Sequence, residues 1–272
     1  MSILRLALGT AILLNACAPA NPPIPSGNFP AATNLSAGQR AAIGRKIWQN
    51  ESGGTVNGLT AWNSGEEFPS LGIGHFIWYP AGFKGRFQES WPAFVAFAKR
   101  QGATPPAIAQ QRFSPWGSRA EFQGEFNSAG MSGLRKWLAS TVPLQTDFII
   151  ARSRAALPTM LAAAPASERA KIQSNYQKVS STSQGTYALI DYVNFKGDGT
   201  QASEKYKGQG WGLLQVLGGM NSVSPGNAAA SEFAASAKRT LSRRIANSPP
   251  ARGEARWREG WHNRCDTYAR PL

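Results

Sequence analysis

A single carboxylate, Glu51, stands where a predicted helix ends. Ser-Ala-Gly-Gln at positions 36–39 has the spacing of a capping box, which predicts a helix that begins there. Ile43, Ile47 and Glu51 recur every four residues, so we expect the carboxylate on the apolar face of this helix. Ser-Gly-Gly at 52–54 predicts the end of the helix, because glycine readily adopts the left-handed conformation of a C-cap.

This position would favour the protonated form of the Glu51 carboxyl. Apolar neighbours disfavour the ionised form, and the negative end of the helix dipole opposes another negative charge, so both effects would raise its pKa. A carboxyl that stays protonated near neutral pH can act as a general acid. The alternative interpretation is an ordinary glutamate at a helix end whose side chain reaches solvent.

Turn and strand signals follow this carboxylate. The Asn-Gly pair at 57–58 is typical of a tight hairpin, and residues 70–78 form a short extended run with two glycines. A helix that ends in glutamate, then a hairpin, then Gly-Ile-Gly-His at 72–75, resembles the lysozyme superfamily and most closely the bacteriophage-type lysozymes. Glu51 followed by Ser52 is also similar to the Glu-Ser pair of lytic transglycosylases.

The resemblance implies a role for each matching residue. In that family the acid ends the first helix, a small sheet follows, and a Thr-x-Gly-x-Gly-His strand faces the acid across a cleft. The resemblance implies that Glu51 protonates the oxygen of the MurNAc-β-1,4-GlcNAc bond of peptidoglycan. The bond would then be cleaved by hydrolysis or by lytic transglycosylation. Ser70 occupies the position of the family's threonine and would hold water or the sugar. The alternative is a strand residue whose side chain bonds to the backbone. His75 would contact substrate or, as the alternative, tie sheet to helix.

The second catalytic group is less well defined by the sequence. The phage-type pattern has an aspartate six residues before the threonine, and this position is Ser64 here. Glu66 and Glu67 lie nearby, and adjacent strand residues point in opposite directions, so at most one faces the cleft. We take Glu66 as catalytic and Glu67 as substrate-binding. The alternatives are a solvated turn, or a transglycosylase-like reaction in which one acid suffices and the substrate's N-acetyl group assists.

Several further side chains are candidates for substrate binding. Trp62, Trp78 and Tyr79 are amphipathic rings on which a sugar face could pack, although core packing explains each of them equally well. Asn194 and its neighbour Asp191 lie on a predicted central helix and provide reserve polar groups.

The first residues have the pattern of an export signal, and we do not expect them to be part of the folded domain. Residues 1–16 contain an arginine followed by a short apolar run, which is typical of a secretory signal. Leu-Asn-Ala-Cys at 14–17 resembles a lipobox, which implies lipidation of Cys17; a plain signal peptide cut nearby is the alternative. Residues 17–34 would then be the lipidated cysteine and a flexible tether, and residues 35–272 the lysozyme-like catalytic domain.

Composition and charge restrict the possible partners. The chain has 272 residues, 42% of them hydrophobic and 16% charged, with a net charge of +14. Such a charge attracts polyanions, but export and the lack of a DNA-reading motif disfavour nucleic acid. We expect a monomer on the periplasmic face of the envelope, bound to peptidoglycan glycan strands and anchored in the membrane through Cys17. We expect Cys265 to be a buried structural thiol, and a cysteine peptidase that pairs it with His75 or His262 is disfavoured.

Helical patterns dominate the rest of the chain. The predicted fold class is α+β, mostly α, a lysozyme-like helical lobe with a small antiparallel β-sheet inserted after the first helix. Two histidines and no His-Glu-x-x-His motif give no metal ligand set, so we expect neither a metal nor a cofactor. The main alternative function is a non-catalytic peptidoglycan-binding lipoprotein of the cell envelope.

Overall fold

The computed structural model describes residues 35–85, 89–201 and 204–272. The predicted signal segment, the predicted lipidation site Cys17 and the predicted tether lie outside these ranges. Within the described ranges, no helix is long and apolar enough to cross a membrane.

Helix α1 (Ala37–Ser52) begins and ends as its sequence predicts. The backbone N–H of Gln39 donates to the hydroxyl of Ser36, and the Gln39 side chain accepts from the Ser36 N–H, which confirms the capping box. Gly53 ends the helix with φ 61°, a left-handed conformation that glycine adopts without steric cost. Glu51 therefore lies in the last turn of α1.

A small antiparallel sheet follows α1 directly, which confirms the predicted order of elements. Its three strands are paired in chain order, with β2 in the middle. The predicted hairpin at Asn57-Gly58 is wrong, because these residues begin a 3₁₀ turn instead. The elements of this N-terminal lobe are η1 (Asn57–Leu59), β1 (Thr60–Ala61), β2 (Ser70–Leu71), β3 (Phe76–Ile77), α2 (Trp91–Arg100), η2 (Ala107–Gln110), α3 (Arg119–Gly124) and α4 (Ala129–Ser140).

The stretch 70–78 forms a hairpin rather than one extended strand. Ser70 pairs with Ile77 across β2 and β3, and the Gly-Ile-Gly-His motif at 72–75 forms the turn between them. Gly72 has φ 72°, and a Cβ there would overlap with the Oε1 atom of Gln145. The glycine is therefore needed both for the turn and for its close approach to α5 (Val142–Ala163).

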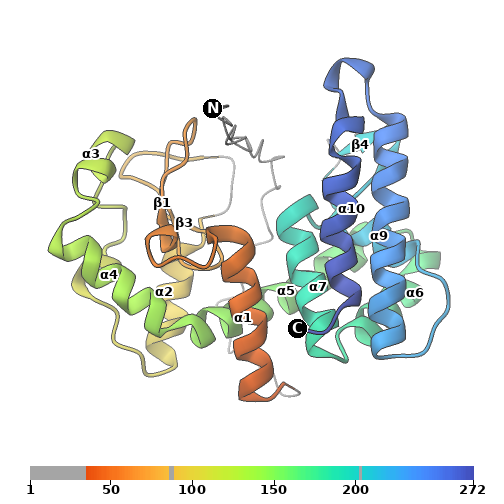
Figure 1. Ribbon diagram of the computed structural model, residues 1–272, viewed down its shortest axis with the longest axis horizontal. Helices are drawn as coiled ribbons and strands as arrows, with labels where there is room; N and C mark the ends of the chain where they lie inside the picture. The colour runs from red at the N-terminus through yellow and green to blue at the C-terminus, as the bar shows by residue number, and fades with distance from the viewer. Residues whose placement is uncertain (1–34, 86–88, 202–203) are drawn as a thin grey trace, which may run out of the picture.

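Helix α5 lies between the N-terminal lobe and a C-terminal lobe, and it contacts α1, α2, α6 and α7 (Figure 1). The C-terminal lobe is helical apart from a two-stranded hairpin. Its elements are η3 (Ala166–Glu168), α6 (Arg169–Val179), α7 (Ser183–Lys196), β4 (Lys205–Tyr206), β5 (Gln209–Gly210), α8 (Leu213–Gly218), α9 (Asn227–Asn247), η4 (Pro250–Arg252), η5 (Glu254–Trp257), α10 (Arg258–Asp266) and η6 (Thr267–Ala269).

One cluster of buried side chains runs from α1 through both lobes to the end of α10 and η6. In the N-terminal lobe it is strongly aromatic, and the rings of Trp78 and Trp91 stack with their centroids 5.3 Å apart. In the C-terminal lobe Tyr192, Phe233 and Tyr268 meet edge-on or tilted. The described chain is thus mostly helical, with one small sheet inserted after its first helix.

Gln145 links α5 to the turn of the hairpin. It is fully buried, its Oε1 accepts the N–H of Ile73 at 2.9 Å, and its Nε2 donates to the carbonyl of Leu138 at 2.7 Å. We expect Gln145→Leu to lower the free energy of unfolding by about 2 kcal/mol, because it leaves the buried N–H of Ile73 without a partner and removes one hydrogen bond from the Leu138 carbonyl. Urea denaturation followed by circular dichroism measures the change.

The matched control is Gln123→Leu, the same substitution at an exposed position of α3. We expect its unfolding midpoint to stay close to that of the wild type. An equal shift in both variants would contradict a special role for Gln145.

Candidate functional site

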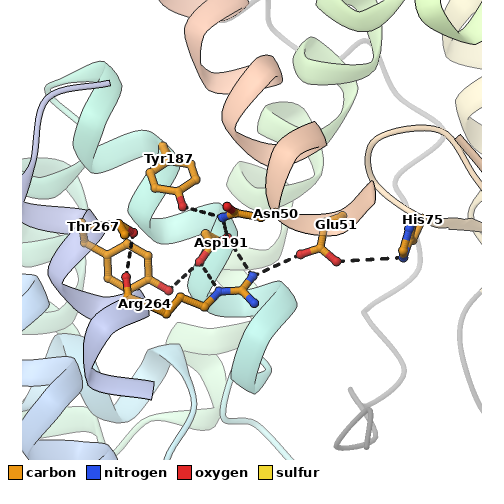
Figure 2. A network of polar contacts seen from close by, with 8 residues as sticks. Asn50, Glu51, His75, Tyr187, Asp191, Arg264 and Thr267 are labelled. Atoms are coloured by element: carbon orange, nitrogen blue, oxygen red, sulfur yellow. Dashed lines mark hydrogen bonds and ion pairs between the residues drawn. The ribbon is translucent and has the colours of Figure 1, made fainter. Parts of the chain in front are cut away.

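Glu51 belongs to a polar network that joins distant parts of the chain (Figure 2). The network combines the end of α1, the hairpin turn that carries His75, the middle of α7 and the last turn of α10. Its central side chain is Arg264, which extends from α10 and lies between Asp191 on α7 and Glu51 on α1.

Asp191 fixes the position of Arg264. The guanidinium donates from Nε to Asp191 Oδ2 and from Nη2 to Asp191 Oδ1, both at 2.8 Å. This bidentate geometry is the strongest form of an arginine–carboxylate pair. Burial alone would lower the pKa of Arg264, but hydrogen bonds and charge attraction from Asp191 outweigh burial and raise it. Arg264 is therefore a permanent cation of the site.

The remaining lone pairs of Asp191 are also satisfied. Asp191 is 2% exposed, and it accepts hydrogen bonds from Asn50 Nδ2 at 3.0 Å and from the Tyr268 hydroxyl at 2.6 Å. Asn50 also donates to the hydroxyl of Tyr187 at 2.7 Å. Burial, followed by the charge of Asp191, raises the pKa of Tyr187 to about 12, so this hydroxyl stays neutral. Asp191 has no capacity left for a substrate.

Glu51, in contrast, is accessible. Its side chain is 22% exposed, Oε1 accepts from Arg264 Nη2 at 3.1 Å, and Oε2 lies 4.0 Å from Nδ1 of His75. His75 itself is 28% exposed and has φ 46°, an uncommon conformation outside glycine that turns its ring toward α1. The expected apolar surroundings of Glu51 are wrong: Ile43 and Ile47 are buried, but the last helical turn points its carboxylate at a guanidinium and an imidazole.

The network contains more carboxylates than guanidinium groups. One guanidinium faces two carboxylates, so the network carries one net negative charge when Glu51 and Asp191 are both ionised and His75 is neutral. Glu51 is also the more exposed of the two carboxylates. Glu51 is thus the carboxylate of this network that a bound ligand could reach.

The structure does not bring Glu66 or Glu67 into this network. Both lie in the loop between β1 and β2, where the Glu66 carboxylate accepts from Asn63 Nδ2 at 3.1 Å. The backbone carbonyl of Glu66 accepts the indole N–H of Trp62 at 2.7 Å, and Glu67 is exposed. The contacts of Glu66 thus stabilise its own loop.

The other predicted site residues are mostly part of the core. Trp62, Trp78 and Tyr79 are 4%, 0% and 7% exposed, so their rings present almost no free face to a sugar. Ser70 is 4% exposed in the central strand β2. Asn194 is exposed on α7, one helical turn beyond Asp191. Of the predicted residues, His75 is the one that the described contacts bring to Glu51.

Sequence reasoning missed the partners that hold Glu51. Arg264 was visible only as one member of a basic segment at 252–264, and Tyr268 only as an apolar residue of the last helix. The prediction that Cys265 is a buried thiol is confirmed; burial raises its pKa to about 12, which disfavours a nucleophilic role. A basic residue on the same helical face as buried aromatic residues was the available signal for Arg264.

Breaking the ion pair between Asp191 and Arg264 should cause a measurable loss of stability. Asp191→Asn removes the charge that compensates Arg264, and we expect the free energy of unfolding to fall by about 3 kcal/mol. The control is Asp266→Asn, which breaks a more exposed ion pair with Lys238 and should cost less than about 1 kcal/mol. Thermal and urea denaturation of both variants measure the difference, and equal losses would contradict this assignment.

Known proteins give no independent assignment of this site. No protein-family model, no curated protein and no solved structure matches the chain.

Proposed function

We propose that this protein is a peptidoglycan-cleaving glycosidase with a lysozyme-like arrangement, and that Glu51 is its general acid. The observation that carries the proposal is the partly exposed carboxylate at the end of α1, held by Arg264 and facing the Gly-Ile-Gly-His turn through His75. The order of helix, small sheet and hairpin turn in the described chain is consistent with this assignment. The bond cleaved is the β-1,4 bond between MurNAc and GlcNAc.

In the proposed reaction Glu51 gives its proton to the glycosidic oxygen as the bond from that oxygen to the sugar C1 breaks. Positive charge develops on the sugar ring and needs a partner. Asp191 is buried and fully hydrogen-bonded, and Glu66 lies outside the network, so the geometry favours assistance by the substrate's own N-acetyl group. The ionised Glu51 then takes a proton either from the sugar O6, which attacks C1 to form a 1,6-anhydro ring, or from water.

A Glu51→Gln variant tests the acid. Glutamine keeps the shape and the contact to Arg264 but has no proton to give, so we expect the clearing rate on a peptidoglycan zymogram to fall by at least about 100-fold. Glu67→Gln, at an exposed loop position, is the matched control and should clear like the wild type. Undiminished clearing by Glu51→Gln would remove Glu51 from the mechanism.

Mass spectrometry of the released fragments separates the two chemical outcomes. Anhydro ends indicate transglycosylation and reducing ends indicate hydrolysis. We expect anhydro ends, because the described network contains no second carboxylate that is free to activate water. Wild-type protein that binds sacculi but releases no fragments would instead favour the non-catalytic binding function.

We also propose that the protein is exported and lipid-anchored through Cys17. The proposal follows from the sequence pattern at 14–17, since these residues lie outside the described ranges. Metabolic labelling with a fatty-acid probe should mark the wild type and not Cys17→Ala. Labelling that persists in the variant would refute the anchor, whereas Cys265→Ala should keep its label.

A further inference from the structure

One side of α10 carries aromatic rings that start next to the Glu51 network. Trp257, Trp261 and Arg264 are spaced by four and three residues, so they share one face of a continuous helical segment. Phe195, at the end of α7, packs against this face. We call Phe195, Trp261 and Trp257 the α10 aromatic row.

The row is continuous with the candidate site through direct contacts. The guanidinium carbon of Arg264, which binds Glu51, lies 4.5 Å from the ring centre of Phe195. The centroids of Phe195 and Trp261 are 6.4 Å apart, and those of Trp261 and Trp257 are 5.7 Å apart in a stacked geometry. All three rings are partly exposed. They therefore form an accessible apolar surface that leads away from Glu51.

The far end of the row is positively charged. Arg256 lies over the ring of Trp257 at 4.5 Å, and both Arg256 and Arg258 are exposed. The carboxylate of Glu254 is 2% exposed and is bound to Arg244 by two hydrogen bonds of 2.9 Å, so it does not neutralise these arginines. The exposed Glu259, which follows Arg258, leaves this end of the row with a net positive charge of one. An exposed arginine stacked on a partly exposed indole is suited to a ligand that has both an apolar face and negative charges.

Trp261 is held firmly from within the lobe. The amine of Lys196 lies 3.4 Å from its ring centre, and the guanidinium carbon of Arg244 lies 5.0 Å away. Both side chains are nearly buried, at 6% exposure each, and burial lowers the pKa of the Lys196 amine to about 6. These contacts order the ring before any ligand arrives, which reduces the entropy lost on binding.

We propose that the α10 aromatic row binds the glycan strand on one side of Glu51, and that Arg256 and Arg258 bind carboxylates carried by that strand. The inference rests on the proposed function and specifies its substrate: an anionic glycan, with sugar faces on the rings and acidic peptide stems at the arginines. Charge complementarity selects this occupant over a neutral polysaccharide, because the rim of the row is cationic.

The test measures binding without cleavage, in a Glu51→Gln background, by co-sedimentation with purified sacculi. We expect Trp257→Ala to weaken binding at least about fivefold. The control Phe113→Ala removes another exposed ring with an arginine over it, in the N-terminal lobe, and should bind like its parent. Circular dichroism verifies that each variant is folded.

The contribution of the positive charge of Arg256 is tested separately. Arg256→Gln should weaken binding to sacculi and reduce its salt dependence, while binding of neutral chito-oligosaccharides, measured by tryptophan fluorescence, should not change. Arg100→Gln, an exposed arginine at the end of α2, is the control. Equal binding by Trp257→Ala and Phe113→Ala, or no binding by the Glu51→Gln parent, would overturn the inference. The proposed activity is judged independently, from the zymogram of wild type against Glu51→Gln.

Discussion

The bidentate pair between Asp191 and Arg264 is the interaction on which the candidate site depends. It connects α7 to α10, and the same guanidinium then reaches the last turn of α1. Removing two charges from water is costly, and the pair is tolerable because its geometry is good and Asn50 and Tyr268 satisfy the remaining lone pairs of Asp191. The result is a rigid cation beside Glu51 whose charge is already compensated.

A second constraint orders the opposite side of the site. The turn that carries His75 is short, and its backbone is fixed by Gln145 from α5 and by the left-handed conformation of Gly72. Helix α5 therefore positions the imidazole, while α7 and α10 position the guanidinium. Glu51 lies between two groups that belong to different lobes, so its environment is a consequence of how the lobes pack (Figure 2).

Contacts between arginines and aromatic rings continue into the C-terminal lobe, away from Glu51. Arg264 and Arg244 each lie against an aromatic ring, and each contact combines apolar burial with the attraction of a cation to a ring face. The same packing leaves Trp257 partly exposed at the outer end of α10. This structural stack of arginines and rings is also the surface on which we propose that the glycan binds.

Local patterns in the sequence determined the start of α1 at Ser36, its end at Gly53, the sheet that follows and the burial of Cys265. Each depends on residues a few positions apart, where helix caps, glycine conformations and hydrophobic spacing act directly. The same patterns failed for the Asn57-Gly58 turn, because its backbone continues into a 3₁₀ turn.

Only the tertiary structure decided what surrounds Glu51. Its partner Arg264 is 213 residues away along the chain, and Arg264 is 73 residues from Asp191. No local spacing encodes such contacts, because they follow from how α1 packs against α7 and how α7 and α10 both pack against α9. The sequence by itself thus determined that a carboxylate ends the first helix. The packing of the lobes decided that it meets a guanidinium and an imidazole instead of an apolar pocket.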